Sequence, residues 1–92
     1  MNKKIQEIMD ILQEECAEVI QEISKIRRFG LDTADYNANM ECTHRTSLEK
    51  ELGDLLAMID LLVENNIITT ESLESAKQAK FAKLKQWSTI YE

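Results

Sequence analysis

Apolar residues near the start of the chain recur at alternating steps of three and four, the spacing of a helical packing seam. At 3.6 residues per turn this spacing forms one stripe along a helix. Arg27 and Arg28 suit the negative end of a helix dipole, and Gly30 suits the position after a helix. The pattern predicts a helix from about Lys3 to Phe29. The apolar series consists of Ile5, Ile8, Leu12, Cys16, Val19, Ile23 and Ile26.

A second helix is predicted to begin near Ser47. Thr46, followed three residues later by Glu49, has the spacing of a capping box. Asn65 and Asn66 are suitable residues for the end of this helix. Its main apolar stripe consists of Leu48, Leu52, Leu55, Leu56, Ile59, Leu62 and Val63, widened by Met58, Leu61 and Ile68.

A third helix is predicted to start after Thr70, with Glu71 and Glu74 in its first turn, and to end near Trp87. Its expected inward residues are Leu73, Ala76, Phe81 and Leu84. Residues 30–45 show no clear period and are long for a connection in so small a domain, so they are either functional or contain a short helix near 34–39. With no proline and two glycines, the chain predicts an all-α bundle, a single domain over residues 1–92.

The second helix is apolar around much of its circumference. Two partner helices from the same chain cannot cover so wide a surface, and the usual solution is a bundle shared between subunits. We therefore expect a homodimer or a homotetramer.

The chain carries a formal net charge of −6. Because an acidic chain does not attract polyanions, neither nucleic acid nor a membrane surface is expected as a partner. No stretch has the length of a membrane span, and the charged N-terminal segment lacks the apolar core of a signal peptide. Cys16 and Cys42 are too few for a disulfide framework, and His44 is expected to be an ordinary surface histidine. We expect a cytoplasmic protein.

Two carboxylate pairs interrupt the apolar stripes: Glu15 with Glu18, and Glu51 with Asp54. Residues three apart share one face of a helix, so each pair can aim at one point. Four converging carboxylates repel one another and lose hydration unless cations lie between them. Mg²⁺ prefers such oxygen ligands and commonly bridges to substrate phosphates. The pairs therefore favour a metal site over solvated surface charges.

Gly53 lies between the two acids of the second pair, inside a predicted helix. Glycine at such a position costs about 1 kcal/mol relative to alanine. A packing role and a functional role explain it equally well. In both cases we expect another group to approach the backbone closely beside the carboxylates.

The run Glu14-Glu15-x-x-Glu18, followed by Glu51-x-x-Asp54 within ELGDLL, resembles the MazG-like nucleotide pyrophosphohydrolases, an all-α family with ExxE and ExxD motifs on adjacent helices. The resemblance covers the first two thirds of the chain well and the third helix loosely. It implies that Glu15, Glu18, Glu51 and Asp54 bind Mg²⁺, or alternatively Mn²⁺. It also implies that a nucleoside triphosphate is hydrolysed to the monophosphate and pyrophosphate. Glu14 is then an additional catalytic acid, either supporting a metal ligand or activating water.

The segment between Glu18 and Glu51 is somewhat longer than is usual in that family. A tight hairpin would separate the two acidic pairs by roughly seven residues, about 10 Å at 1.5 Å per residue. Three arrangements remain open. The connection runs back along the first helix, the first helix ends early, or the second pair faces the first pair of another chain.

An acidic protein that binds a triphosphate also needs direct cationic contacts. Lys80 and Lys83 lie three apart in the third predicted helix. The resemblance favours at least one of them as a phosphate contact, with Arg28 as a lesser candidate. Candidates for stacking on a nucleobase are Phe29, Tyr36 and Trp87, and candidates for contacting its edges are Asn37, Asn39, His44 and Arg45.

These features together predict an Mg²⁺-dependent enzyme that hydrolyses nucleoside triphosphates. A phosphoribosyl-ATP pyrophosphatase is the first alternative, because it uses a similar set of acids in a small helical fold. A helical dimerisation or regulatory module without catalysis is the second. In such a module the acids are solvated, and Mg²⁺ leaves the melting temperature unchanged.

Overall fold

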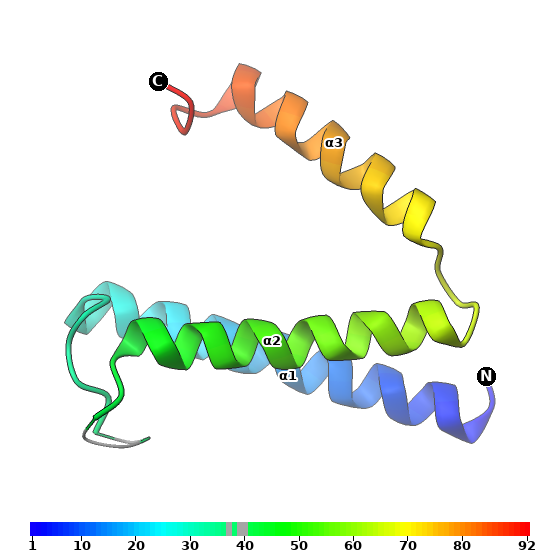
Figure 1. Cartoon of the computed structure of the whole chain (residues 1–92), viewed down its shortest axis with the longest axis horizontal. Helices are drawn as coiled ribbons and strands as arrows, with labels where there is room; N and C mark the ends of the chain where they lie inside the picture. Colours follow the sequence, from blue (N-terminus) through cyan, green and yellow to red (C-terminus); the bar gives the residue numbers. More distant parts are fainter. Residues whose placement is uncertain (37, 39–40) are drawn as a thin grey trace. The chain divides into compact units, whose positions relative to one another are not determined.

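The computed structural model describes residues 1–36, 38 and 41–92. Within these residues the chain forms three helices and no strand (Figure 1): α1 (Lys3–Phe29), α2 (His44–Glu64) and α3 (Thr70–Trp87). The prediction of an all-α fold is confirmed. The chain divides into two compact units, Met1–Leu61 and Leu62–Glu92.

Helix α1 has the predicted bounds and is capped at both ends. The Asn2 side chain accepts a hydrogen bond of 2.8 Å from the backbone N–H of Ile5, which satisfies one free donor of the first turn. At the other end, the Gly30 N–H donates to the Ile26 carbonyl at 2.7 Å. Gly30 has a φ of 94°, a conformation that favours glycine.

Helix α2 begins at His44, three residues earlier than predicted, because its cap is formed by two threonines. The Thr43 N–H donates to the Thr46 hydroxyl at 3.0 Å, and the Thr46 N–H donates to the Thr43 hydroxyl at 3.3 Å. The predicted capping box of Thr46 and Glu49 is therefore wrong, and a hydroxyl takes the place of the usual carboxylate. The helix ends at Glu64 as predicted, and Asn66 has a left-handed φ of 61°.

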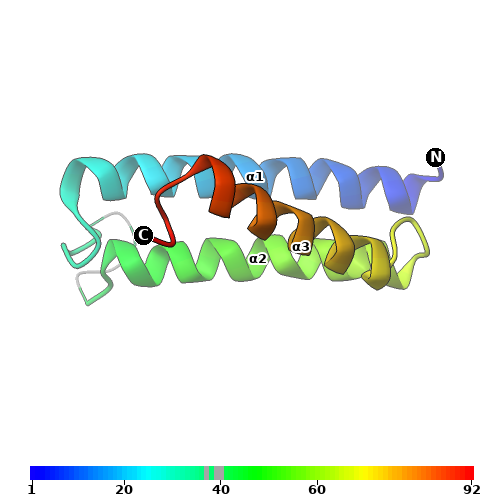
Figure 2. The ribbon, with the colours of Figure 1, turned by 90° about the horizontal axis from the view of Figure 1, so that it is seen from above.

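In the first unit, α1 and α2 run antiparallel and side by side (Figures 1 and 2). The connection between them is held by backbone bonds from Asp35 N–H to Cys42, from His44 N–H to Thr33 and from Arg45 N–H to Leu31, at 2.7, 3.1 and 2.8 Å. Since His44, the first residue of α2, contacts Glu22 of α1, the connection runs back along α1, the first of the three arrangements left open by the sequence. The described residues of segment 34–39 contain no helix. Asn37 and Asn39, candidates for base contacts, lie outside the described residues.

Few apolar side chains are buried in one copy of the chain. Among the described residues, the buried ones are Ile5, Ile8 and Leu62. Helix α3, capped by Thr69, has no buried residue. Of its predicted inward residues, Leu84 is half-buried, whereas Leu73, Ala76 and Phe81 are exposed. No helix in the described part of the chain has the length and apolarity needed to cross a membrane.

Candidate functional site

Three carboxylates from α1 and α2 converge midway along the hairpin. One ligand oxygen each from Glu15, Glu51 and Asp54 lies within 4.8 Å of the other two. All three residues are half-buried. The acidic cluster formed by these residues joins acids from both predicted pairs within one chain.

The other two predicted acids of α1 lie outside this group. Glu18 is exposed but lines a cavity of about 200 Å³ together with Glu51. Glu14 is exposed, and it is turned about 100° around the helix from Glu15. The structure thus brings together three of the four predicted ligands, places Glu18 beside them and leaves Glu14 apart.

The carboxylates of the acidic cluster repel one another, and this repulsion contributes to a shift in the pKa of Glu15. Partial burial raises the pKa of Glu15 above its usual 4.5, and the negative charges of Asp54, Glu51 and Glu18 raise it further. The nearby charge of Lys50 opposes this shift in the pKa of Glu15. The Lys50 ammonium lies 3.0 Å from Asp54 Oδ2 and 3.6 Å from Glu51 Oε1, and these carboxylates raise the pKa of Lys50.

A second cluster, the buried polar cluster, joins α1, the connection and the start of α2. It consists of Glu22, Asp35 and His44, with exposed fractions of 5%, 2% and 4%. The imidazole Nδ1 of His44 donates to Glu22 Oε1 at 3.1 Å and lies 3.8 Å from Asp35 Oδ2. The Ser47 hydroxyl donates to Asp35 Oδ2 at 2.7 Å. The prediction that His44 is a surface residue is wrong.

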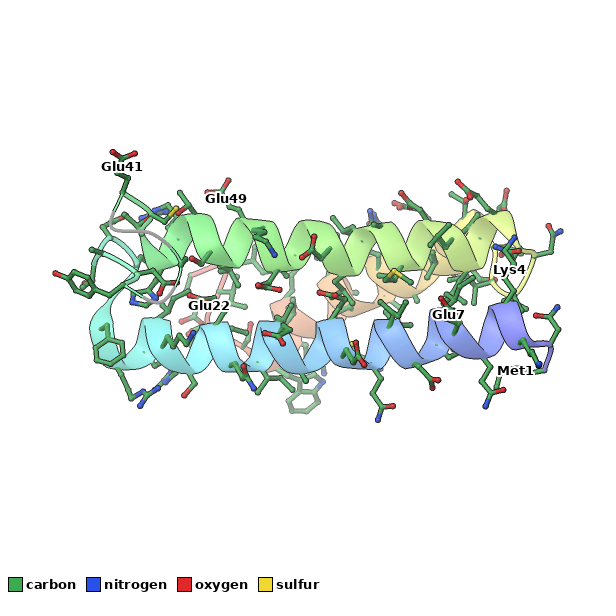
Figure 3. The ribbon with its side chains drawn as sticks, turned by 90° about the horizontal axis from the view of Figure 1, so that it is seen from below. Met1, Lys4, Glu7, Glu22, Glu41 and Glu49 are labelled. Atoms are coloured by element: carbon green, nitrogen blue, oxygen red, sulfur yellow. The ribbon has the colours of Figure 1, made fainter. Side chains whose placement is uncertain are left out.

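The buried polar cluster sets the register between the two helices. His44 at the start of α2 meets Glu22 of α1, and Figure 3 shows Glu22 between the two helices. In an antiparallel pair, seven residues forward on one helix lie opposite seven residues back on the other. Glu51 is seven residues after His44, and Glu15 is seven before Glu22. The contact at the end of the hairpin therefore places Glu51 opposite Glu15.

Two cavities lie between the acidic cluster and the connection, and the central one reaches Glu51 of the cluster. The central cavity, of about 200 Å³, is lined by Glu18, Gln21, Glu22, Lys25, Asp35, Ala38, Ser47, Lys50 and Glu51. The aromatic cavity, of about 340 Å³, is lined by Lys25, Arg28, Phe29, Thr33, Ala34, Asp35, Tyr36 and His44. Because both are lined by Lys25 and Asp35, they adjoin each other.

Arg28, one of the predicted phosphate contacts, lines the aromatic cavity. Its guanidinium lies 5.2 Å from the ring centre of Phe29, and Phe29 stacks on His44 with ring centres 5.7 Å apart. Phe29 and Tyr36, two candidates for base stacking, line the same cavity. Lys80 and Lys83 are exposed on α3 in the second unit.

The expected close approach at Gly53 is absent. Apart from its chain neighbours and the backbone of its own helix, a Cβ atom built on this residue meets no described atom within 4 Å. In this structure the glycine therefore relieves no steric conflict beside Glu51 and Asp54.

Three residues of this region were not singled out as candidates from the sequence. Glu22 had a usable signal, because it follows Glu15 by seven residues, nearly two helical turns, and so lies on the same face. Lys50 adjoins Glu51 and is four residues before Asp54, a spacing at which helical side chains interact. Asp35 lies in the connection, where no period indicates which side chain turns inward.

The donor atoms of the acidic cluster suit a hard divalent cation. Such ions take carboxylate oxygens as ligands, and Mg²⁺ in particular binds one or two carboxylates together with substrate phosphates. A cation would also offset the repulsion that raises the pKa of Glu15. Glu15, Glu51 and Asp54 therefore fit a metal site.

Comparison with known protein families agrees with these features. The family model described as the MazG nucleotide pyrophosphohydrolase domain matches residues 3–86. Searches among curated proteins and among solved structures gave no significant match. The matched region contains the acidic cluster, the buried polar cluster, α1, α2 and all of α3 except its last residue. On this basis the chain belongs to the MazG nucleotide pyrophosphohydrolase family.

Proposed function

We propose that this protein is an Mg²⁺-dependent pyrophosphohydrolase that converts a ribo- or deoxyribonucleoside triphosphate into the monophosphate and pyrophosphate. The observation that carries the proposal is the convergence of Glu15, Glu51 and Asp54 from two helices, with ligand oxygens within 4.8 Å of one another. These residues would hold the ion. A bound divalent ion neutralises phosphate charge, lowers the pKa of a bound water and stabilises charge at the attacked phosphorus.

We assign roles in substrate binding and catalysis to further side chains as part of this proposal. Glu18, which lines the central cavity with Glu51, is proposed as the fourth carboxylate of the metal site. Glu14 keeps its predicted role as an additional acid. Arg28, Lys80 and Lys83 are proposed as phosphate contacts, since charge-assisted hydrogen bonds are the strong ones.

We place the nucleoside in the aromatic cavity, which adjoins the central cavity at Lys25 and Asp35. Its volume of about 340 Å³ lies within the usual range for small-molecule sites. The rings of Phe29 and Tyr36 offer faces on which a base can stack. This placement puts the triphosphate toward the acidic cluster.

The test is a screen of canonical and modified nucleoside triphosphates, and phosphoribosyl-ATP, with Mg²⁺ and with a chelator. We expect a nucleoside monophosphate and pyrophosphate in equal amounts, formed only with the divalent ion. Cleavage of phosphoribosyl-ATP alone would favour the related pyrophosphatase instead. No hydrolysis of any substrate, together with a melting temperature unaffected by Mg²⁺, would leave a non-catalytic helical module.

A further inference from the structure

Lys50 lies where the acidic cluster meets the central cavity. Its ammonium contacts Asp54 at 3.0 Å and Glu51 at 3.6 Å, and both acids are proposed metal ligands. Lys50 also lines the central cavity together with Glu18 and Glu51. The flexible Lys50 side chain therefore contacts the carboxylates and also lines the cavity beside them.

An exposed lysine paired with an acid four residues later on a helix is common and contributes little to stability. Lys50 differs from that ordinary pair in two ways. Both of its acidic partners belong to the same three-residue cluster. Its charge also acts on Glu15 of the other helix. Its surroundings are therefore those of a counter-ion for the whole cluster.

A divalent ion and the Lys50 ammonium are attracted to the same carboxylates. When the ion takes these oxygens as ligands, the two cations repel each other and the ammonium loses its partners. The four-carbon stem of lysine is flexible and carries three donors. Lys50 also lines the central cavity, which adjoins the aromatic cavity. A triphosphate in the central cavity would offer it new anionic partners.

We propose that Lys50 is an internal counter-ion that competes with the divalent ion for Glu51 and Asp54, and then contacts the substrate phosphates once the ion is bound. This inference rests on the proposed function, because it takes the acidic cluster as the metal site. It assigns to one side chain two effects of opposite sign. Lys50 weakens metal binding in the absence of nucleotide and strengthens nucleotide binding in the presence of metal.

The test is Lys50→Met, which removes the charge and keeps most of the stem. Calorimetric titration with Mn²⁺ in the absence of nucleotide should show binding about three- to tenfold tighter than in the parent. Titration with a non-hydrolysable nucleoside triphosphate in saturating Mg²⁺ should show binding about tenfold weaker. Lys50→Arg should restore most of the nucleotide affinity.

Lys3→Met is the matched control, because it makes the same change on the exposed first turn of α1. Twelve residues of helix place it about 18 Å from Glu15, beyond the screening length at physiological salt. Neither affinity should change in this variant. Unchanged Mn²⁺ affinity in Lys50→Met would contradict the competition, and unchanged nucleotide affinity would contradict the phosphate contact. Failure of the proposed function itself would give a different result. In that case the parent protein and the Asp54→Asn variant would bind Mn²⁺ equally, or neither would bind it.

Discussion

The surroundings of Glu15 in the acidic cluster shift its pKa. Its pKa in the folded chain is raised above 4.5 by partial burial and by Asp54, Glu51 and Glu18. A carboxyl group with a raised pKa binds more protons in the folded state than in the unfolded state. Its effect on stability is therefore most favourable at low pH and is lost as the pH rises through the folded pKa.

Below its raised pKa, Glu15 carries a proton that a metal ion must displace, so the affinity for Mn²⁺ should rise as the pH rises through this pKa. Calorimetric titrations between pH 5 and pH 8 measure this dependence. Glu15→Gln should remove the Glu15 part of it, and without metal at neutral pH this variant should melt higher than the parent. A pH dependence identical in parent and variant would show that Glu15 is no ligand.

Gly53 provides a second test at the scale of one residue. An added Cβ meets no described atom within 4 Å, so Gly53→Ala should gain the helix propensity of alanine without a clash. We expect the free energy of unfolding to rise by about 1 kcal/mol, measured by urea denaturation. A loss of stability would show that a group of another chain or of the substrate-binding region occupies the space beside Glu51.

The hairpin of α1 and α2 depends on the buried polar cluster for its register. Removing one partner from a buried hydrogen-bonded pair leaves the other without compensation. His44→Ala should therefore lower the free energy of unfolding by about 3 kcal/mol. Because the same contact places Glu51 opposite Glu15, the variant should also bind Mn²⁺ more weakly. Urea denaturation and calorimetry measure the two effects.

Arg45→Ala is the control for that change. Arg45 follows His44 directly, but it forms an exposed ion pair with Asp32 at 2.8 Å. Exposed pairs contribute at most about 1 kcal/mol, and the Arg45 guanidinium donates hydrogen bonds to both carboxylate oxygens of Asp32. Its loss should leave Mn²⁺ binding unchanged. If His44→Ala is as mild as Arg45→Ala, the buried polar cluster does not set the register.

Helix positions could be predicted well because they depend on local patterns. The seam from Ile5 to Ile26 and the signals at Gly30 and Asn65 gave bounds that agree with the structure. The start of α2 was missed because two threonines cap it, while Thr46 and Glu49 fit the more familiar pattern. The register of the hairpin depends on contacts of residues far apart in the sequence, and the sequence alone left three arrangements open.

Part of the candidate site followed from spacing alone. Glu51 and Asp54 share one face of α2 because they are three residues apart, which the sequence shows directly, whereas their convergence with Glu15 of α1 depends on the register of the hairpin. His44 was misjudged because its burial results from the backbone bonds of the connection, not from any apolar period. Lys50 was missed because its significance lies in the cavity beside it, which only the folded chain reveals.

For the whole molecule, exposed apolar side chains on the hairpin of α1 and α2 favour association between subunits. Ile20 of α1 and Leu56 of α2 have exposed fractions of 68% and 59%, and a partner chain would cover such apolar side chains. We propose a homodimer or a homotetramer. Sedimentation at micromolar concentration should show no folded monomer, and Leu56→Glu should lower both association and stability. The same change at Leu31, an exposed leucine of the connection, is the control. A compact, stable monomer would contradict this proposal.

Glu15, Glu51 and Asp54 are proposed to hold the ion required for hydrolysis of a nucleoside triphosphate. The most direct test is the rate of Mg²⁺-dependent pyrophosphate release by Glu51→Gln, compared with Glu49→Gln. Glu49 lies two residues away but is exposed on the side of α2 that faces away from α1 (Figure 3). We predict a loss of at least about a hundredfold for Glu51→Gln and a rate near that of the parent for Glu49→Gln. Equal rates in the two variants, with both retaining their helical content, would contradict a metal site at Glu51.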